Sequence, residues 1–178
     1  MKFTQTITAC ILISALAIGG CKKDKDNDDA VGGSGTLTAS SYGFDGSNSG
    51  KFSSTAAGIV KASAGGASVL TITGIKDGSK ELITIVILKD VTTTGKIQFG
   101  SQYANGGITL SKDYTKPADL SLNYSTDNNG TTMAGGGEVN ITKIDGNNIE
   151  GTFYAIAYNN NQKEAFAEQG AFKGTINK

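Results

Sequence analysis

Five glutamates are the side chains of this sequence that could act in pairs as acid and base catalysts. They are Glu81, Glu138, Glu150, Glu164 and Glu168. Two carboxyl groups on either side of a glycosidic bond can hydrolyse it. Glu150, however, falls on the polar side of an alternating segment, and Glu164 and Glu168 lie beside a turn. We therefore expect all five on the solvated surface and no enzyme activity, with a carboxylate-dependent glycosidase as the least favoured alternative.

Two loops rich in asparagine and aspartate contain the oxygen atoms that a calcium ion would need. The segment STDNNG includes Asp127, and the segment DGNN includes Asp145. Neither segment has the ligand spacing of an EF-hand, and such side chains commonly hydrogen-bond to the local backbone in turns. We expect turns at both places, no metal site and no cofactor, and we keep Asp127 and Asp145 as the calcium candidates.

Tyrosines are the remaining side chains that could bind a ligand, because an aromatic ring can stack on a sugar ring. Tyr154 and Tyr158 lie in one alternating segment with the spacing that places them on the same face of a strand. The sequence has no tryptophan, the strongest stacking residue. Tyr154 and Tyr158 are the ligand-binding candidates. An equally simple interpretation is that they cover a second hydrophobic layer or a partner.

The composition excludes several classes of function. All sixteen basic residues are lysines, they equal the acidic residues in number, and the sequence has neither arginine nor histidine. Without arginine or net positive charge, nothing favours nucleic acid as a partner. Without histidine, a Ser-His-Asp or Cys-His catalytic group cannot form. Both cysteines, Cys10 and Cys21, precede the segment expected to fold, so that segment has no disulfide.

Alternating apolar and polar residues, separated by Gly-Gly, Asp-Gly and Asn-Gly pairs, continue to the end of the sequence. This pattern is typical of antiparallel strands joined by tight turns, and no window indicates a helix. We predict a single all-β domain over 36–178, an antiparallel β-sandwich or flattened β-barrel of about nine to eleven strands, with a closed lipocalin-like barrel as the alternative. Strands are expected at 36–42, 51–54, 57–63, 67–75, 81–89, 95–100, 107–112, 119–125, 135–144, 148–158 and 164–176.

Two of these strands carry the strongest predictions about the core. The run ELITIVILK, residues 81–89, is apolar on both faces, which predicts a central strand covered on both sides, by another layer or by a loop. In the strand at 148–158, Phe153 should anchor the core, and Gly151 should allow a neighbouring backbone to approach closely or mark a bend. The inward residues of this strand are expected to be Ile149, Gly151, Phe153, Ala155 and Ala157.

The N-terminal segment has the features of an export signal. Lys2 precedes an apolar stretch, residues 7–18, that is too short to span a bilayer, and Gly19 and Gly20 stand before Cys21. This segment resembles the lipobox of bacterial lipoproteins. The resemblance implies that residues 1–20 are a signal peptide that is removed, and that Cys21 becomes the first residue and is acylated, as with palmitate, which attaches the protein to a membrane.

Residues 21–35 contain a charged run, KKDKDNDD, and a Gly/Ser tract with too few apolar residues to fold. We expect this segment to be a flexible tether. Its acidic cluster resembles the surface-export signal of Bacteroidota lipoproteins, and a solvated spacer is the alternative interpretation. The resemblance implies an outer-membrane lipoprotein of the cell envelope, with exposure at the cell surface left open.

The C-terminal half contains a pattern of glycines, aromatic residues and alternating aliphatic residues, which are typical of sheets and turns. Its residues are Gly137, Val139, Ile141, Thr142, Ile144, Asp145, Ile149, Gly151, Thr152, Phe153, Ala157, Gly170 and Phe172. This pattern resembles that of a family of small Bacteroidota lipoproteins of unknown function. The resemblance implies a secreted, lipid-anchored β domain without an established activity.

These features together predict a noncatalytic binding or structural module, displayed on a tether from a lipid anchor at Cys21. Its partner would be a glycan or a protein at the cell surface. The alternative is a carrier that encloses a small apolar ligand in its barrel. A carrier requires an empty internal cavity of about several hundred Å³, whereas a module of the first kind does not.

Overall fold

The computed structural model describes residues 33–178, which form ten antiparallel strands. Cys10, Cys21 and the predicted signal and most of the predicted tether lie outside the described residues. Within residues 33–178, no helix is long and apolar enough to cross a membrane. The strands are β1 (Gly35–Phe44), β2 (Ser47–Ala64), β3 (Ala67–Ile75), β4 (Leu82–Ile87), β5 (Gly95–Phe99), β6 (Gly106–Ser111), β7 (Asn123–Ser125), β8 (Gly136–Asp145), β9 (Asn148–Tyr158) and β10 (Glu164–Thr175).

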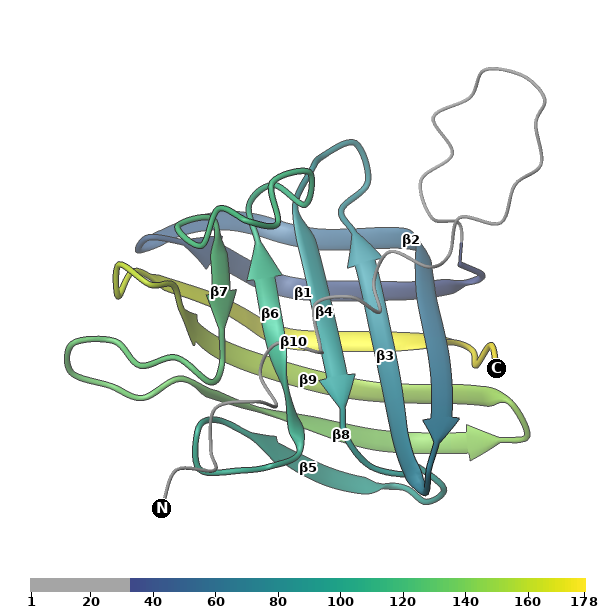
Figure 1. The fold of residues 1–178 in the computed structure, drawn as a ribbon. Coiled ribbons are helices and arrows are strands. Elements are labelled where there is room, and N and C mark those ends of the chain that lie inside the picture. The colour runs from purple at the N-terminus through teal and green to yellow at the C-terminus, as the bar shows by residue number, and fades with distance from the viewer. Residues whose placement is uncertain (1–32) are drawn as a thin grey trace, which may run out of the picture. The chain divides into compact units, whose positions relative to one another are not determined.

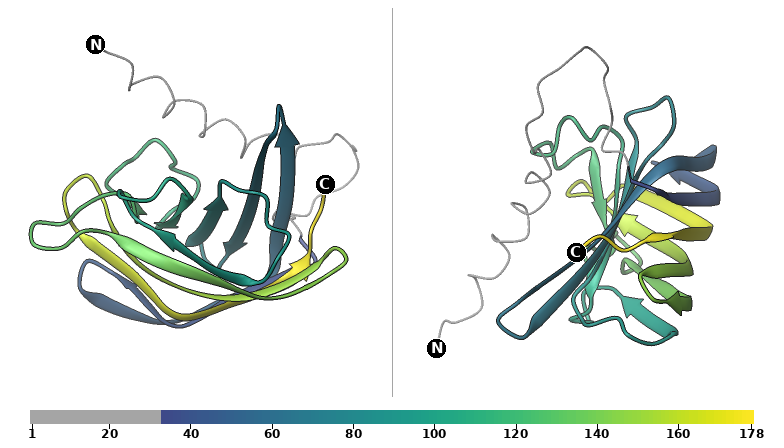
Figure 2. Two further views of the ribbon diagram at one scale, coloured as in Figure 1. Left: turned by 90° about the horizontal axis from the view of Figure 1, so that it is seen from below. Right: turned by 90° about the vertical axis from the view of Figure 1, so that its right-hand side faces the viewer.

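Eight of the strands close into a barrel. Each pairs with the next in the order β10, β1, β2, β3, β4, β6, β7 and β9, and β9 pairs again with β10. The remaining two extend this barrel, because β8 pairs with β9 and β5 pairs with β8 (Figure 1). The all-β prediction is therefore confirmed, and its closed-barrel alternative is the architecture that forms. The barrel is flattened, with β3, β4, β6 and β7 crossing in front of β1, β10, β9 and β8 (Figures 1 and 2).

A bend in β2 joins the two layers. The strands predicted at 51–54 and 57–63 are one continuous strand, which pairs with β1 before the bend and with β3 after it. The register passes from Leu37↔Ser54 to Gly35↔Ala57, so β2 has an extra residue there. Such a bulge bends a strand and increases its twist. The carboxylate of Asp77 accepts hydrogen bonds from the backbone N–H (3.1 Å) and hydroxyl (3.2 Å) of Thr55 at the bend.

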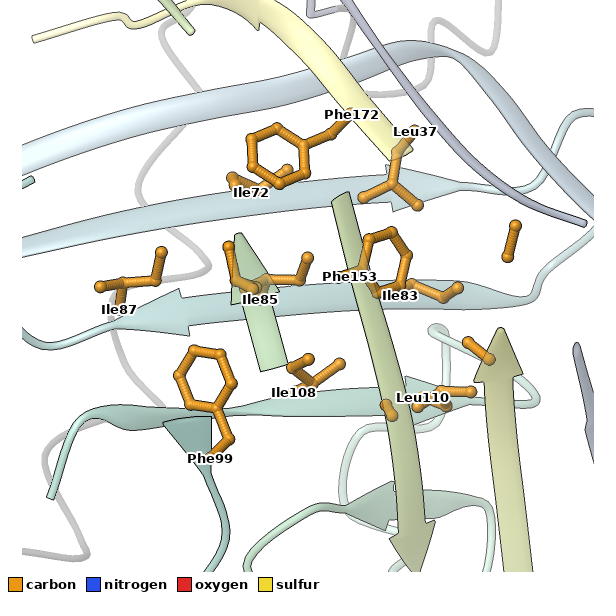
Figure 3. Packing of buried hydrophobic residues seen from close by; sticks show 14 of the residues in the cluster. Leu37, Ile72, Ile83, Ile85, Ile87, Phe99, Ile108, Leu110, Phe153 and Phe172 are labelled. Atoms are coloured by element: carbon orange, nitrogen blue, oxygen red, sulfur yellow. The ribbon is translucent and has the colours of Figure 1, made fainter. Parts of the chain in front are cut away.

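Buried side chains from both layers fill the interior. Figure 3 shows aliphatic residues of β3, β4 and β6 meeting aromatic residues of β9 and β10. The labelled residues are all nearly inaccessible to solvent, and they belong to one continuous hydrophobic cluster. They are Leu37, Ile72, Ile83, Ile85, Ile87, Phe99, Ile108, Leu110, Phe153 and Phe172.

Strand β4 is central in the sheet but is covered on one face only. Its inward residues Ile83, Ile85 and Ile87 are completely buried, as predicted. Its outward residues, however, are half-buried, and Leu88 just after the strand is 39% exposed. The expected cover on both sides is therefore wrong for residues 33–178. Apolar β-branched side chains suit the pleated outer surface of a barrel, where neighbouring strands shield them partly.

Two contacts between an aromatic ring and a glycine hold β9 against β10. Phe153 is paired with Gly170, and Gly151 is paired with Phe172. A Cβ atom at either glycine would lie 2.4 Å from a carbon of the opposite ring, and only glycine leaves room for that contact. The predicted close approach at Gly151 is confirmed, and the approaching group is mainly a side-chain ring. The inward orientation predicted for alternate residues of 148–158 is confirmed as well.

Replacing Gly170 with alanine should destabilise the barrel by about 1–3 kcal/mol, the usual cost of inserting a methyl group into a tightly packed core. Urea unfolding followed by circular dichroism measures this loss. Gly58→Ala is the matched control, because Gly58 also lies in a strand but has no atom within 4 Å of the position of a Cβ. Combining Gly170→Ala with Phe153→Leu should recover part of the loss. Equal losses at Gly170 and Gly58 would contradict the ring–glycine contact.

Candidate functional site

An open hollow of about 320 Å³ lies on the outer face of strands β8, β9 and β10. The side chains of Thr152 and Tyr154 point outward here, because they alternate with the buried residues of β9. Tyr154 is 46% exposed and is paired directly with Glu138 on β8. The residues that line the hollow are Glu138, Thr152, Phe153, Tyr154, Gln169, Gly170 and Ala171.

A bulge in β10 forms one side of the hollow. The register passes from Ala167↔Ala155 to Gly170↔Phe153, so Glu168 and Gln169 together stand opposite the single residue Tyr154. The packing of the core requires this bulge. Ala165 and Ala167 before it and Gly170 and Phe172 after it are all buried. Regular alternation of inward and outward residues would turn one of these pairs toward solvent. Gln169 adopts the left-handed backbone conformation, with φ of 50°. Bulges of this kind redirect side chains, often beside functional sites.

Glu138 forms the opposite side and is held in place by β5. The Gln98 side chain donates a hydrogen bond to one carboxylate oxygen (2.5 Å), and the Lys96 ammonium lies 3.1 Å from the other. The Glu138 side chain is only 14% exposed. The hollow thus combines an exposed aromatic ring, a fixed carboxylate, an amide and a hydroxyl. This set can bind a ligand through stacking and hydrogen bonds, whereas hydrolysis of a glycosidic bond needs a second carboxyl group.

A different group of polar residues closes one end of the barrel. The buried Tyr42 donates a hydrogen bond from its hydroxyl to Glu81 (2.6 Å), and Lys76 contacts both the hydroxyl and the Glu81 carboxylate. Lys76 directly follows β3, and Glu81 directly precedes β4. The turn between these two strands therefore brings the ion pair over the ring of Tyr42.

The same arrangement occurs a second time at this end. The buried Tyr124 donates a hydrogen bond to Asp45 (2.7 Å), and Lys112 forms an ion pair with Asp45. The Lys112 ammonium also lies 5.6 Å from the ring centre of Tyr124 and 5.7 Å from that of Phe44. Phe44 contacts the rings of both Tyr42 and Tyr124. The aromatic rings thus seal this end, and the charged groups lie over them.

The pKa directions show how these groups support each other. Burial, together with the hydrogen bond to Glu81, raises the pKa of Tyr42, so the hydroxyl keeps its proton. Burial alone would also raise the pKa of Glu81, but the hydrogen bonds from Tyr42 and Lys76 outweigh it and lower that pKa. The tyrosine hydroxyl, the carboxylate and the ammonium therefore stabilise one another at this end of the barrel.

The two predicted tyrosines have different surroundings. Tyr154 is exposed in the hollow, whereas Tyr158 is buried although both point outward. The loop after β7 covers Tyr158, since a Cβ at Gly130 would lie 2.5 Å from its ring. The Tyr158 hydroxyl donates a hydrogen bond to Glu164 (3.0 Å). The ring of Tyr158 therefore packs within the protein and cannot stack on a ligand there.

The two calcium candidates lie apart, beside different turns. Asp145 is the exposed last residue of β8, next to the tight turn in which Gly146 has φ of 60°. Asp127 follows β7, and partial burial of its carboxylate near Gly107 raises its pKa. Among residues 33–178, no three histidine, cysteine, aspartate or glutamate side chains gather closely enough to hold a metal ion.

The glutamates are dispersed, and three of them are not fully solvated. Glu150 and Glu168 are exposed, as predicted. Glu81, Glu138 and Glu164 are half-buried, so the expectation of surface positions is wrong for these three. Each has a tyrosine or lysine partner that comes from another strand or turn. The sequence indicates such pairings poorly, because Tyr42 is distant from Glu81 along the chain, and Lys96 and Gln98 are distant from Glu138.

Comparison with known proteins places the chain in a family. Residues 40–175 match DUF6252, a domain of unknown function, and the chain belongs to this family. The match covers nearly the whole barrel. No curated protein and no solved structure matches the chain. The predicted membership of an uncharacterised family of β domains is thus confirmed at this level.

Replacing Glu81 with glutamine should flatten the acid dependence of stability. The pKa of Glu81 in the folded protein is below its ordinary value of 4.5. The ionised carboxylate therefore stabilises the fold fully above pH 4.5, and this stabilisation is lost as the pH falls through the folded-state pKa. The free energy of unfolding of the unmodified protein should therefore fall more steeply between about pH 5 and pH 3 than that of Glu81→Gln.

Urea unfolding at a series of pH values tests this expectation. Glu150→Gln is the control, since Glu150 is exposed and its ion pair with Lys143 should contribute little. The control should follow the unmodified protein. Parallel pH curves for Glu81→Gln and the unmodified protein would contradict a stabilising role for the Tyr42–Glu81–Lys76 group.

Proposed function

We propose that the protein is a lipid-anchored, noncatalytic binding module of the bacterial cell envelope. The observation that carries the binding function is the hollow around Tyr154, an exposed aromatic ring with fixed polar groups on the outside of a filled barrel. Ligand sites commonly combine an apolar surface with a few positioned polar groups. The partner would be a glycan or a protein that the module meets at the cell surface.

The distribution of carboxylates supports binding rather than catalysis. Glu138 is the single carboxylate among the residues that line the hollow, and Lys96 and Gln98 engage both of its oxygen atoms. Glu81 is engaged at the barrel end, and Glu164 accepts a hydrogen bond from Tyr158. A glycosidase needs two carboxyl groups about 5–10 Å apart on either side of one bond. We therefore propose that the module binds without turnover.

The filled interior disfavours the carrier alternative. Side chains from both layers occupy the space where a small apolar ligand would have to lie (Figure 3). Enclosing a ligand there would require the displacement of residues such as Phe153 and Phe172, which hold the register of β9 and β10. The exterior hollow needs no such rearrangement.

The anchor is proposed at Cys21. The cysteine follows an apolar segment and two glycines, the pattern of a lipoprotein signal, and the acidic run after it resembles the export signal of Bacteroidota lipoproteins. Because β1 begins at Gly35, residues 21–34 would connect the lipid to the barrel.

Labelling with an alkyne analogue of palmitate tests the anchor. In a bacterial host that processes lipoproteins, the full chain should incorporate the label and fractionate with membranes, whereas Cys21→Ala should do neither. Two or more acyl chains would make the attachment stable. Cys10→Ala is the matched control, because Cys10 lies within the proposed signal and should be removed with it. Labelling that persists in Cys21→Ala would refute the proposal.

A further inference from the structure

We propose that the hollow around Tyr154 binds one neutral sugar residue of a longer glycan, with the sugar ring stacked on Tyr154 and its hydroxyls bonded to Glu138 and Gln169. This inference rests on the proposed binding function and specifies its ligand class. Four observations support it: the size and openness of the hollow, the exposure of the Tyr154 ring, the polar side chains beside that ring, and the charge of the residues around the hollow.

The dimensions of the hollow favour a single ring. Its volume of about 320 Å³ lies at the lower end of the range for ligand sites, roughly 300–1,000 Å³. The hollow lies on the outer face of the sheet and is open to solvent, so the protein need not enclose the rest of a longer glycan chain. A small, open site of this kind suits one residue within a polymer better than an isolated molecule that must be enclosed.

Tyr154 provides the apolar surface that a sugar ring requires. Its side chain is 46% exposed, although its neighbours Phe153 and Ala155 on β9 are buried in the core. These buried neighbours fix the backbone of β9, so the ring projects from a rigid strand rather than from a mobile loop. A rigid aromatic side chain loses little conformational entropy when it binds, and exposed aromatic area provides a large apolar contact.

Polar groups stand on two sides of the ring, where the hydroxyls of a stacked sugar would project. Glu138, directly across on β8, is a hydrogen-bond acceptor whose orientation is set by Gln98 and Lys96. Gln169, on the β10 bulge, can both donate and accept. Thr152 adds a hydroxyl on the same face. A mainly apolar surface with a few donors and acceptors beside it suits a polyol, because hydroxyls surround the edge of a sugar ring.

The charge near the hollow favours a neutral ligand. Glu138 lines it, and Glu168 stands beside Gln169 on the bulge, whereas the ammonium of Lys96 is paired with Glu138. An anionic sugar such as a uronic acid would bring a like charge close to these carboxylates. Neutral hexose or pentose residues meet no such repulsion. The hollow should therefore discriminate against acidic polysaccharides.

A polysaccharide panel and substitution of Tyr154 test this inference. The purified full chain should bind at least one neutral polysaccharide in an array and in affinity electrophoresis, and acidic polysaccharides should bind more weakly. Tyr154→Ala should weaken binding about tenfold or more, a loss of about 1.4 kcal/mol. Tyr154→Phe should retain most of the binding, because it keeps the ring. Glu138→Gln should weaken binding less than Tyr154→Ala.

Tyr114→Ala is the matched control, because Tyr114 is 40% exposed but lies in a separate loop. Circular dichroism should show that all the variants are folded. If Tyr154→Ala and Tyr114→Ala bind the polysaccharide equally strongly, the assignment of the site is wrong. If the protein prefers acidic glycans, the proposed ligand class is wrong. Binding to no saccharide, with a photo-crosslink from position 154 to a protein partner, would overturn the sugar proposal and leave the binding function intact.

Discussion

The register of β9 against β10 is the constraint on which the rest of this structure depends. Phe153 lies over Gly170, and Phe172 lies over Gly151, so neither strand can slip by one residue without turning a ring toward solvent. Ala165 and Ala167 are also buried, yet they have the opposite phase along β10. One extra residue must therefore lie between Ala167 and Gly170, so that both the alanines before it and the glycine and phenylalanine after it face the core. The resulting bulge stands opposite Tyr154, so the packing of the core creates the hollow on the surface.

Closure of the barrel explains why the candidate site is outside rather than inside. The bend in β2 lets one strand belong to both layers, and the short contact between β7 and β9 completes the ring of strands. Side chains from both layers meet in one buried hydrophobic cluster between them (Figure 3). Of the two strands outside the closed ring, β8 carries Glu138, and β5 holds that carboxylate in place through Gln98 and Lys96.

The family match and the candidate site describe different properties of the chain. Residues 40–175 match DUF6252, and the glycines and phenylalanines that carry the sequence resemblance are those that pack β8, β9 and β10. They explain why the fold forms but specify no activity. Tyr154, Glu138 and Gln169 depend on that framework and lie at its surface. The proposed anchor at Cys21 precedes the matched region, so location and ligand binding are separate proposals with separate tests.

The sequence by itself determined the all-β fold, most of the strands and the inward face of β9, because alternation and tight turns are local properties of the chain. The strand predicted at 119–125 forms only over Asn123–Ser125, because turns occupy the residues before it. The strand predicted at 164–176 did not include the bulge between Ala167 and Gly170, which the pairing of β10 with β9 shows. Only the tertiary structure decided that Tyr154 is exposed while Tyr158 is covered, because the covering loop comes from a distant segment. It likewise decided the pairing of Tyr42 with Glu81 and of Tyr124 with Asp45, since closure of the barrel brings these residues together.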